Sequence, residues 1–510
     1  MSGTQYLSPR WAAVLGGLVV LYLALHASTI TTSRLPWFDD TFFASVADTL
    51  NRTGEYKLTA APLWLDKPVY LYGPVYFVVL GNIFQQFGIG VTQTRVPGLL
   101  CGLGLVLVAY GILRRAQVRQ PLAAITCAAM ALDPTFHQNS HSGRMDSMAT
   151  FFILLGFYCL VRGGDGTRRS TIAWTAASAT FASLGILTTP RPGYLLIPMG
   201  LILLVRWARR RDLVSGAAAV VWGSVILLFL AAWVLYAFGS IPALLKYYAD
   251  FSEDYTSGGF GVRALHAPLL VPLGLLIVAA LLIQPGILLY DIPFFTVMGI
   301  VEFYLFVKDK GAFGGLYSFF IIPLTYLALG YLLARLREAT ADALAMRWVQ
   351  YAVFAFLFLF NGAIFAARTT LEVLQWEARS PAATDATVRA LIPPGSKVVG
   401  DDKFYFAVRK ADSDFQYLQR GGTPEERARY HANDYGFQYL ITAESDTSDD
   451  LQAYLKEVPM VQIATISAPR DGALARFITT IAQWAGIGSS LTANYEGRVF
   501  ARAAARPSAP

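Results

Sequence analysis

The chain has 510 residues, of which 55% are hydrophobic and only 15% are charged, and its formal net charge is +7. About a quarter of the residues in soluble domains are charged. The composition of this chain therefore excludes an ordinary soluble protein and indicates a polytopic membrane protein. The basic residues lie in short runs between apolar segments, which fits topology signals better than a nucleic-acid-binding surface. We therefore expect the lipid bilayer, and no nucleic acid, as a partner.

Apolar segments of bilayer-spanning length recur from the N-terminus to about residue 370. Each is near the ~20 residues that cross a bilayer as a helix. The first, 11–29, lacks a convincing small-residue cleavage site, so we expect it to remain as a signal anchor. The three cysteines lie inside such segments and are expected to be small buried hydrophobes without a disulfide or a zinc site: Cys101, Cys127 and Cys159. The predicted spans are 11–29, 95–113, 121–137, 146–161, 171–188, 192–206, 213–238, 267–284, 287–307, 316–334 and 348–368.

Four basic runs orient these spans. Residues 114–119, 162–169, 206–211 and 335–347 are rich in Arg, and such loops stay on the cytoplasmic side. Residues 70–87 are also apolar, but if they crossed the membrane all four runs would face outward. We therefore expect them to lie in the outer interface, where their tyrosines and a Gly-Pro break fit well. The N-terminus is then cytoplasmic and the C-terminus is extracytoplasmic, in a multi-pass protein of the plasma (inner) membrane.

The outer face receives the segments with the most unusual polar residues. They are residues 30–94, 138–145, 189–191 and 239–266, whereas the cytoplasmic loops are short and merely basic. We therefore expect the chemistry on the outer face. The polar residues at or beside these segments are Asp39, Asp40, Asp66, Lys67, His137, His141, Arg144, Asp146, Arg191, Glu253, Asp254, Arg263 and His266.

The composition changes near residue 370, where charged residues, Gly and Pro return. Short alternating segments and two amphipathic ones predict a small soluble α/β domain over 370–500, outside the membrane. The Ala/Pro-rich tail, 501–510, is predicted to be disordered. Residues 1–369 would form the membrane domain, with interfacial helices in its outer loop 30–94.

The acids of the outer face have both a functional and a structural interpretation. Asp39 and Asp40 follow the first span, where acids also occur in ordinary hydrated loops. Asp146 begins a later span and could cap its helix, but ionisable residues at this depth are functional candidates. Arg144 and Asp146 are spaced i, i+2, which does not place two residues on one helix face. Arg144 therefore need not simply neutralise Asp146.

The cations and histidines are equally open to two interpretations. Arg191 lies between two prolines in a short turn, which suits an anionic headgroup or a side chain that snorkels to lipid phosphates. Lys67 precedes a proline and is a phosphate ligand or an interfacial anchor. His137 and His141 are spaced i, i+4 as a metal pair, but no carboxylate lies at helical spacing. We assign no metal site and expect no cofactor.

An outer-facing cavity with acids and cations suits transfer of a group from a lipid phosphate. A carboxylate can deprotonate an acceptor hydroxyl, and cations can stabilise the phosphate that departs. An apolar substrate explains why such groups lie at the bilayer.

The order of motifs resembles the GT-C superfamily of membrane glycosyltransferases, over about residues 10–335. The branch is similar to the lipid A aminoarabinose transferases and protein O-mannosyltransferases. The acidic pair of that family falls on Asp39 and Asp40, its later acid on Asp146, and the Arg that starts the second span on Arg95. The motifs are WFDDTFF, YGPVYFVV followed by QQFG, TRVPGLL, LTTPRPGYLLIP, HAPLLVP and GGLYSFFIIPLTYLALG.

This resemblance implies a GT-C-like polytopic helical fold of roughly eleven transmembrane helices and an inverting hexosyl- or pentosyltransferase. The donor would be a polyprenyl-phosphate sugar and the acceptor a hydroxyl of a lipid, glycan or protein of the cell envelope. Asp39, or Asp40, would be the general base, and Asp146 would orient the acceptor or support the base. The donor phosphate would meet Arg191, Lys67 and Arg144. The remaining cavity residues would be Tyr72, His141, Arg263 and His266.

Two departures from the family concern its lysines. The lysine before the proline of the interfacial helix corresponds to Gly73, and the lysine of the "LTKGP" turn corresponds to Thr189, with Arg191 as the nearest cation.

The alternative function is a transporter or flippase of a lipid-linked anion. It would need ionisable residues deep in several spans and pseudo-symmetric halves. Glu302 is the main candidate for such an intramembrane acid, and the other spans are nearly free of charge. A membrane-anchored receptor would leave the membrane half unexplained.

Overall fold

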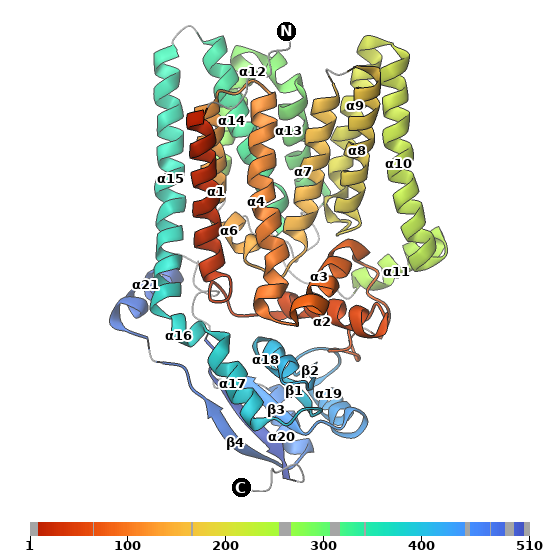
Figure 1. Cartoon of the computed structure of the whole chain (residues 1–510), viewed down its shortest axis with the longest axis vertical. Coiled ribbons are helices and arrows are strands. Elements are labelled where there is room, and N and C mark those ends of the chain that lie inside the picture. The colour runs from red at the N-terminus through yellow and green to blue at the C-terminus, as the bar shows by residue number, and fades with distance from the viewer. Residues whose placement is uncertain are drawn as a thin grey trace.

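The computed structural model describes residues 9–64, 66–164, 167–253, 267–306, 317–340, 343–443, 449–469, 471–484 and 494–503. Long helices run side by side through one half of the molecule, and a mixed sheet with short helices forms the other half (Figure 1). The predicted class, a polytopic helical protein with a small α/β domain, is confirmed.

Five helices within the described residues are long and apolar enough to cross a membrane. They are α1 (Pro9–Thr29), α4 (Val91–Arg115), α7 (Asp146–Gly163), α10 (Leu213–Phe238) and α15 (Ala343–Leu374). The remaining predicted spans coincide with helices that pack between them. These are α5 (Gln120–Ala131), α8 (Arg168–Ile186), α9 (Leu196–Arg210), α12 (Ala267–Ile283), α13 (Asp291–Phe306) and α14 (Ile322–Ala339).

Amphipathic and short helices gather at the end of the bundle that faces the sheet (Figure 1). The segment 70–87 forms one of them, α3, which starts at Pro74 because proline suits the first helical position. Its place at the bundle end, beside α2, matches the predicted interfacial helix. The short helices of the membrane half are α2 (Phe38–Thr53), α3 (Pro74–Phe87), α6 (Pro134–Ser140), η1 (Arg191–Leu195), α11 (Ile241–Glu253), η3 (Pro285–Leu289) and η4 (Tyr317–Phe320).

The basic runs lie at the opposite end of the bundle, where they contact one another. Arg335 donates to the carbonyl of Ala116 at 2.9 Å, and Arg210 donates to the carbonyl of Gly164 at 2.9 Å. These bonds join the loops that the charge pattern assigned to a single side. The sheet domain lies at the other end (Figure 1).

The C-terminal domain is built on a five-stranded sheet with strand order β2-β1-β3-β5-β4. The first three strands are parallel, and β5 pairs antiparallel with β3 and β4. The predicted tail starts too early, because Ala501 is buried in β5 and pairs with Tyr439; residues 504–510 lie outside the described residues. The strands are β1 (Lys397–Gly400), β2 (Asp414–Tyr417), β3 (Tyr439–Ala443), β4 (Met460–Ile466) and β5 (Gly497–Arg502).

Most helices of this domain flank the sheet, whereas α16 connects the domain to α15 and α21 packs against α15 (Figure 1). They are α16 (Trp376–Arg379), α17 (Pro381–Leu391), η5 (Asp402–Phe404), α18 (Tyr405–Lys410), α19 (Pro424–Tyr430), η6 (His431–Tyr435), α20 (Asp449–Glu457) and α21 (Ala473–Trp484).

Direct hydrogen bonds and an ion pair hold the C-terminal domain on the first outer loop. The hydroxyl of Tyr417 hydrogen-bonds that of Thr41 at 3.0 Å, and Arg409 pairs with Asp48 at 3.0 Å. Apolar side chains of both halves form one continuous core around these contacts. The bundle has a second, separate core, in which Cys127 is buried. Cys159 is also buried, whereas Cys101 is only partly buried, so the prediction of buried cysteines is correct for two of the three.

Candidate active site

Asp40 is the anchor of the site. The helix α2 begins at Phe38, so Asp39 and Asp40 both lie in its first turn, where the helix dipole favours carboxylates. The fully buried Oδ2 of Asp40 accepts from Nη2 of Arg95 at 3.0 Å, and Oδ1 accepts from the backbone N–H of Gly143 at 2.5 Å. Both oxygens are therefore engaged, which suits Asp40 to a positioning role.

Arg95 connects this pair to the backbone of the segment between α1 and α2. It donates to the carbonyl of Ile30 at 2.7 Å and to that of Arg34 at 2.8 Å. The sequence singled out Arg95 only as a motif residue. A charged residue at the start of an apolar span was itself a signal for a functional role.

Gly143 allows the loop before α7 to approach α2 closely. A Cβ at this position would lie 2.3 Å from Cγ2 of Thr94 and 3.1 Å from Oδ1 of Asp40. The hydroxyl of the buried Tyr76 donates to the carbonyl of Gly143 at 2.7 Å. The loop is thus held on both sides, and its next residue, Arg144, is fixed beside the acids.

Arg144 joins the two remaining acids. Its Nε donates to Oδ2 of Asp146 at 2.5 Å, and its Nη1 forms an ion pair with Asp39. Arg144 does pair with Asp146, but because it also pairs with Asp39 it does not simply neutralise that one acid. Since Arg144 precedes α7, the spacing rule for residues on a helix does not apply to it. Asp146 is the first residue of α7 but its side chain makes no capping bond. Asp39 has a 21% exposed side chain, against 2% for Arg144 and 0% for Asp146.

Arg191 lies on the other side of Asp146 from Arg144. Its Nη2 donates to the hydroxyl of Tyr72 at 3.0 Å, and its Nη1 lies 3.9 Å from Oδ1 of Asp146. The rigid turn between two prolines, η1, presents this guanidinium with 17% of its side chain exposed. The result is a continuous row of charges, Asp39, Arg144, Asp146 and Arg191, at the bundle end that faces the sheet.

Gly73 shows why the family's lysine is not found at this position. A Cβ on Gly73 would lie 1.9 Å from the carbonyl oxygen of Leu187, and the neighbouring Val75 donates its N–H to that same oxygen at 3.2 Å. The interfacial helix and the turn before η1 are therefore in backbone contact. Only glycine fits there, so any phosphate-binding cation must come from elsewhere.

Two other predicted site residues have different surroundings. Lys67 is half exposed and lies 3.8 Å from Asp250 of α11. His141 is buried against His26 and His137. Arg263 and His266 lie outside the described residues. Of the predicted set, the structure therefore brings together Asp39, Asp40, Asp146, Arg144, Arg191 and Tyr72.

The C-terminal domain adds a polar cavity of about 410 Å³ next to the acidic pair. Trp37, which precedes α2, lines it together with Asp401, Asp402, Lys403 and Arg420, at the carboxyl ends of the parallel strands. Crevices at this edge of α/β sheets commonly bind ligands. Burial raises the pKa of Asp402 to about 6, and the nearby Arg420 lowers it in part. This cavity forms between the membrane half and the C-terminal domain, so the sequence of either part alone did not indicate it.

Comparison with known proteins finds one matching family and several similar structures. The model of the dolichyl-phosphate-mannose-protein mannosyltransferase family matches residues 63–253. ArnT from Cupriavidus metallidurans bound to undecaprenyl phosphate is similar with a TM-score of 0.63 at 15% identity, over 98% of this chain and 100% of that chain. Its apo state gives a TM-score of 0.62 at 14% identity, over 97% and 99%.

A third structure has a similar fold over most of the chain. The Archaeoglobus fulgidus oligosaccharyltransferase in its apo form is similar with a TM-score of 0.52 at 10% identity, over 86% of this chain and 70% of that chain. The chain has the GT-C glycosyltransferase fold. No curated protein sequence matches the chain. The predicted GT-C resemblance is thus confirmed, and the row of charges lies at the end of the helical bundle that faces the sheet domain.

Proposed function

We propose that this GT-C protein transfers a sugar from a polyprenyl-phosphate donor to a hydroxyl group of an acceptor. The observation that carries the proposal is the row Asp39, Arg144, Asp146 and Arg191, which combines a partly exposed carboxylate with a buried cation, Arg144, and a partly exposed one, Arg191. The matched mannosyltransferase family and the similar ArnT, which binds undecaprenyl phosphate, support a lipid-phosphate donor.

Asp39 acts as the general base in this mechanism. Both oxygens of Asp40 are occupied by Arg95 and the N–H of Gly143, whereas Asp39 has an exposed part that an acceptor hydroxyl can reach. Asp39 takes the hydroxyl proton as the acceptor oxygen forms a bond to the anomeric carbon. The bond from that carbon to the phosphate oxygen breaks on the opposite face, so the configuration inverts.

Arg191 receives the leaving phosphate. Its contact with Asp146 is long, at 3.9 Å, and a guanidinium can exchange such a contact for two hydrogen bonds to a phosphate. Negative charge grows on the phosphate as the bond breaks, so a cation fixed by Tyr72 stabilises the transition state. Arg144 already serves two acids and orients Asp39. Lys67 also binds the phosphate of the sugar donor only if that donor extends to the surface near Asp250.

The reaction takes place on the extracytoplasmic side. The four basic runs gather at the other end of the bundle, and basic loops stay in the cytoplasm. The acceptor enters through the cavity lined by Trp37 and Arg420, between the bundle and the C-terminal domain.

The test measures release of polyprenyl phosphate from a polyprenyl-phosphate sugar by purified protein in the presence of cell-envelope acceptors. Asp39→Asn removes the base and should lower the turnover rate by a factor of at least ~100. Asp66→Asn, which changes an exposed acid of the same loop, should retain full activity. A fully active Asp39→Asn variant would exclude Asp39 as the base, and transfer by counterflow in vesicles without sugar release would favour a transporter.

A further inference from the structure

The helix α21 of the C-terminal domain has more apolar surface than the protein covers. One face, with Ala475 and Ile478, packs against Leu371 of α15. A neighbouring face is open, because spacings of three and four residues place its large side chains on one side of the helix. The residues of this apolar strip are Leu474, Phe477 and Ile481, which are 55%, 62% and 48% exposed.

The remaining side of α21 is polar. It carries Arg476 and Thr480, which lie one turn apart and are both exposed. Arg476 donates to the carbonyl of Asp471 at 2.6 Å, and the hydroxyl of Thr480 donates to the carbonyl of Arg476 at 2.9 Å. These bonds stay within the helix and the residues just before it. A helix with an uncovered apolar strip and a polar opposite side is typical of helices that lie in the plane of a membrane interface.

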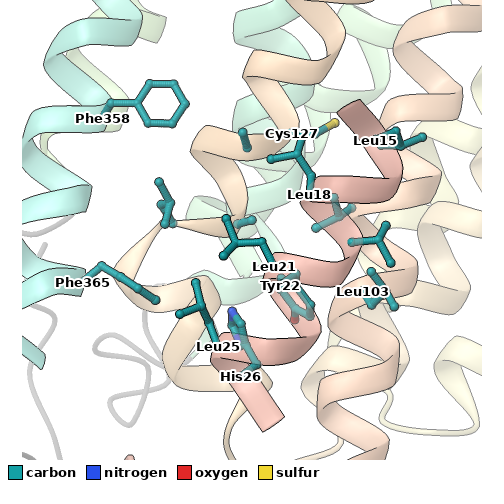
Figure 2. A pocket seen from close by; sticks show the side chains of 15 residues that line it. Leu15, Leu18, Leu21, Tyr22, Leu25, His26, Leu103, Cys127, Phe358 and Phe365 are labelled. Atoms are coloured by element: carbon teal, nitrogen blue, oxygen red, sulfur yellow. The ribbon is translucent and has the colours of Figure 1, made fainter. Parts of the chain in front are cut away.

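The helix that α21 contacts, α15, has few protein neighbours. Only 22% of its most apolar stretch is buried in the protein. An apolar cavity of about 240 Å³ lies between α15 and α1, lined by Phe358 and Phe365 of the one and by Leu18 and Leu25 of the other (Figure 2). Since α15 is one of the membrane-spanning helices, lipid must cover most of its surface.

The contact between α21 and α15 lies at the depth of the lipid headgroups. The predicted span of α15, 348–368, has the ~20 residues that cross the hydrocarbon core. Leu371 lies beyond its end by about 5 Å, within the headgroup region of roughly 5–8 Å on each side of the core. At the same end of α15, Val373 and Trp376 are 64% and 49% exposed, and tryptophan is enriched at membrane interfaces. Figure 1 shows α21 beside this end of α15.

We propose that α21 is a membrane-docking helix, whose residues Leu474, Phe477 and Ile481 insert into the boundary between headgroups and hydrocarbon. The partner is the lipid bilayer, because α21 packs on the end of a lipid-facing helix and the lipid surface continues from there onto the apolar strip. A second protein chain would have to displace these lipids to reach the strip.

Docking gives the C-terminal domain a second attachment, besides its bonds to α2. The side-chain amide of Gln375 donates to both carboxylate oxygens of Asp471, at 2.9 and 2.8 Å, and so fixes the segment before α21 to the end of α15. With the apolar strip in the bilayer, the domain is held at a constant height above the membrane. The cavity at Trp37 then keeps its place relative to the lipid surface.

The experiment measures the depth of α21 in the full chain, reconstituted in phosphatidylcholine vesicles. Phe477→Cys and Thr480→Cys, its matched control on the polar side, are labelled with a fluorophore that senses polarity. Wild-type protein treated in the same way corrects for the native cysteines. Phosphatidylcholine with a spin label near its headgroup should quench at least ~50% of the fluorescence at position 477, and aqueous iodide should quench the label at position 480.

Two outcomes of this experiment would overturn the proposal. Equal quenching by iodide at both positions would place the apolar strip in water. A label at position 477 that neither quencher reaches would show that protein covers the strip, as in an association of two copies of the chain.

A second measurement needs no label. Phe477→Asp places a charge on the apolar strip, where a membrane interface disfavours it, and Thr480→Asp places the same charge on the polar side. In vesicles, the backbone amides of α21 should exchange hydrogen at least ~10-fold faster in Phe477→Asp than in the wild type, whereas Thr480→Asp should match the wild type. Thermal midpoints in detergent establish that both variants are folded. Unchanged exchange in a folded Phe477→Asp variant would refute docking.

Discussion

The carboxylate of Asp40 and the guanidinium of Arg95 form a fully buried ion pair that joins α2 to α4, with 3.0 Å between Oδ2 and Nη2. The pair fixes the first turn of α2 and with it the direction of the neighbouring Asp39. It also determines where the loop that contains Gly143 lies, because the backbone N–H of Gly143 donates a hydrogen bond to the same carboxylate. In the proposed mechanism, Asp40 thus holds the structure and the adjacent Asp39 acts on the acceptor.

Loss of Arg95 should destabilise the protein strongly. Arg95→Met leaves the carboxylate of Asp40 buried without its cation and removes hydrogen bonds to two loop carbonyls. We expect a loss of about 3–5 kcal/mol of unfolding free energy, measured as a lower thermal midpoint in detergent. Arg209→Met, which changes an exposed arginine of α9, should leave the midpoint unchanged. A stable Arg95→Met variant would show that the pair contributes little.

A single methyl group at position 143 should separate activity from folding. In Gly143→Ala the new Cβ would meet Thr94 and Asp40, so the loop must move and take Arg144 with it. Because misplacement of catalytic groups by about 1 Å can lower rates by roughly 100-fold, we expect a large loss of turnover while most of the protein remains folded. The assay compares turnover and thermal midpoint of the same preparations.

The matched control for this substitution lies within α10. At Gly223 a Cβ meets nothing within 4 Å among the described residues, so Gly223→Ala adds the same methyl group without a collision and should behave as wild type. Full turnover of Gly143→Ala would mean that the approach of this loop to α2 is not required.

The parts of the structure that the sequence predicted are those set by local pattern. The apolar segments gave the helices, the charge of the loops separated the two ends of the bundle, and Gly73-Pro74 marked the start of α3. The acidic pair was found because two carboxylates beside a span are unusual.

The parts that it missed depend on contacts between distant segments. His26 joins His137 only after folding, and the collision of any side chain at 73 with Leu187 follows from the packing of two loops. The pairing of Arg144 with Asp146 did not follow from the spacing rule for helices, because Arg144 lies two residues before α7 begins. The cavity at Trp37 and Asp402 lies between the two domains, so the sequence pattern of neither domain indicates it.

Arg191 should determine affinity for the donor phosphate. Arg191→Gln keeps a hydrogen-bond donor near Tyr72 but removes the charge. A charge-assisted hydrogen bond contributes about 1.5–3 kcal/mol, so the affinity for undecaprenyl phosphate should fall by a factor of roughly 10–100. Binding is measured by titration of the purified protein with this lipid.

Two exposed cations on the same side of the bundle serve as comparisons for Arg191. Lys246→Gln in α11 should bind undecaprenyl phosphate as the wild type does. Lys67→Gln distinguishes the two predicted phosphate ligands: an equal loss would make Lys67 a partner of Arg191, and a loss confined to Lys67→Gln would reassign the site to the surface near Asp250.

The stability of the protein should depend on pH through Asp402. Burial raises the pKa of this carboxyl from its ordinary value of 3.8 to about 6 in the folded state. The folded state therefore holds the proton more tightly than the unfolded state, so the contribution is fully present below about pH 4 and is lost as pH rises to 6. Asp402→Asn stays neutral at every pH and should lack this dependence. At pH 7 it should exceed the wild type by roughly 1–2 kcal/mol.

Thermal midpoints at pH 5 and pH 7 give the measurement for Asp402, since the difference between variant and wild type should grow between these two values. Asp412→Asn changes an exposed acid of the same domain and should parallel the wild type at both. If Asp402→Asn is less stable than the wild type at pH 7, the ionised carboxylate is needed, and its partner is Arg420, 3.8 Å away. In that case the cavity at Trp37 holds an ion pair, and ligands that enter it must compete with Asp402 for the guanidinium.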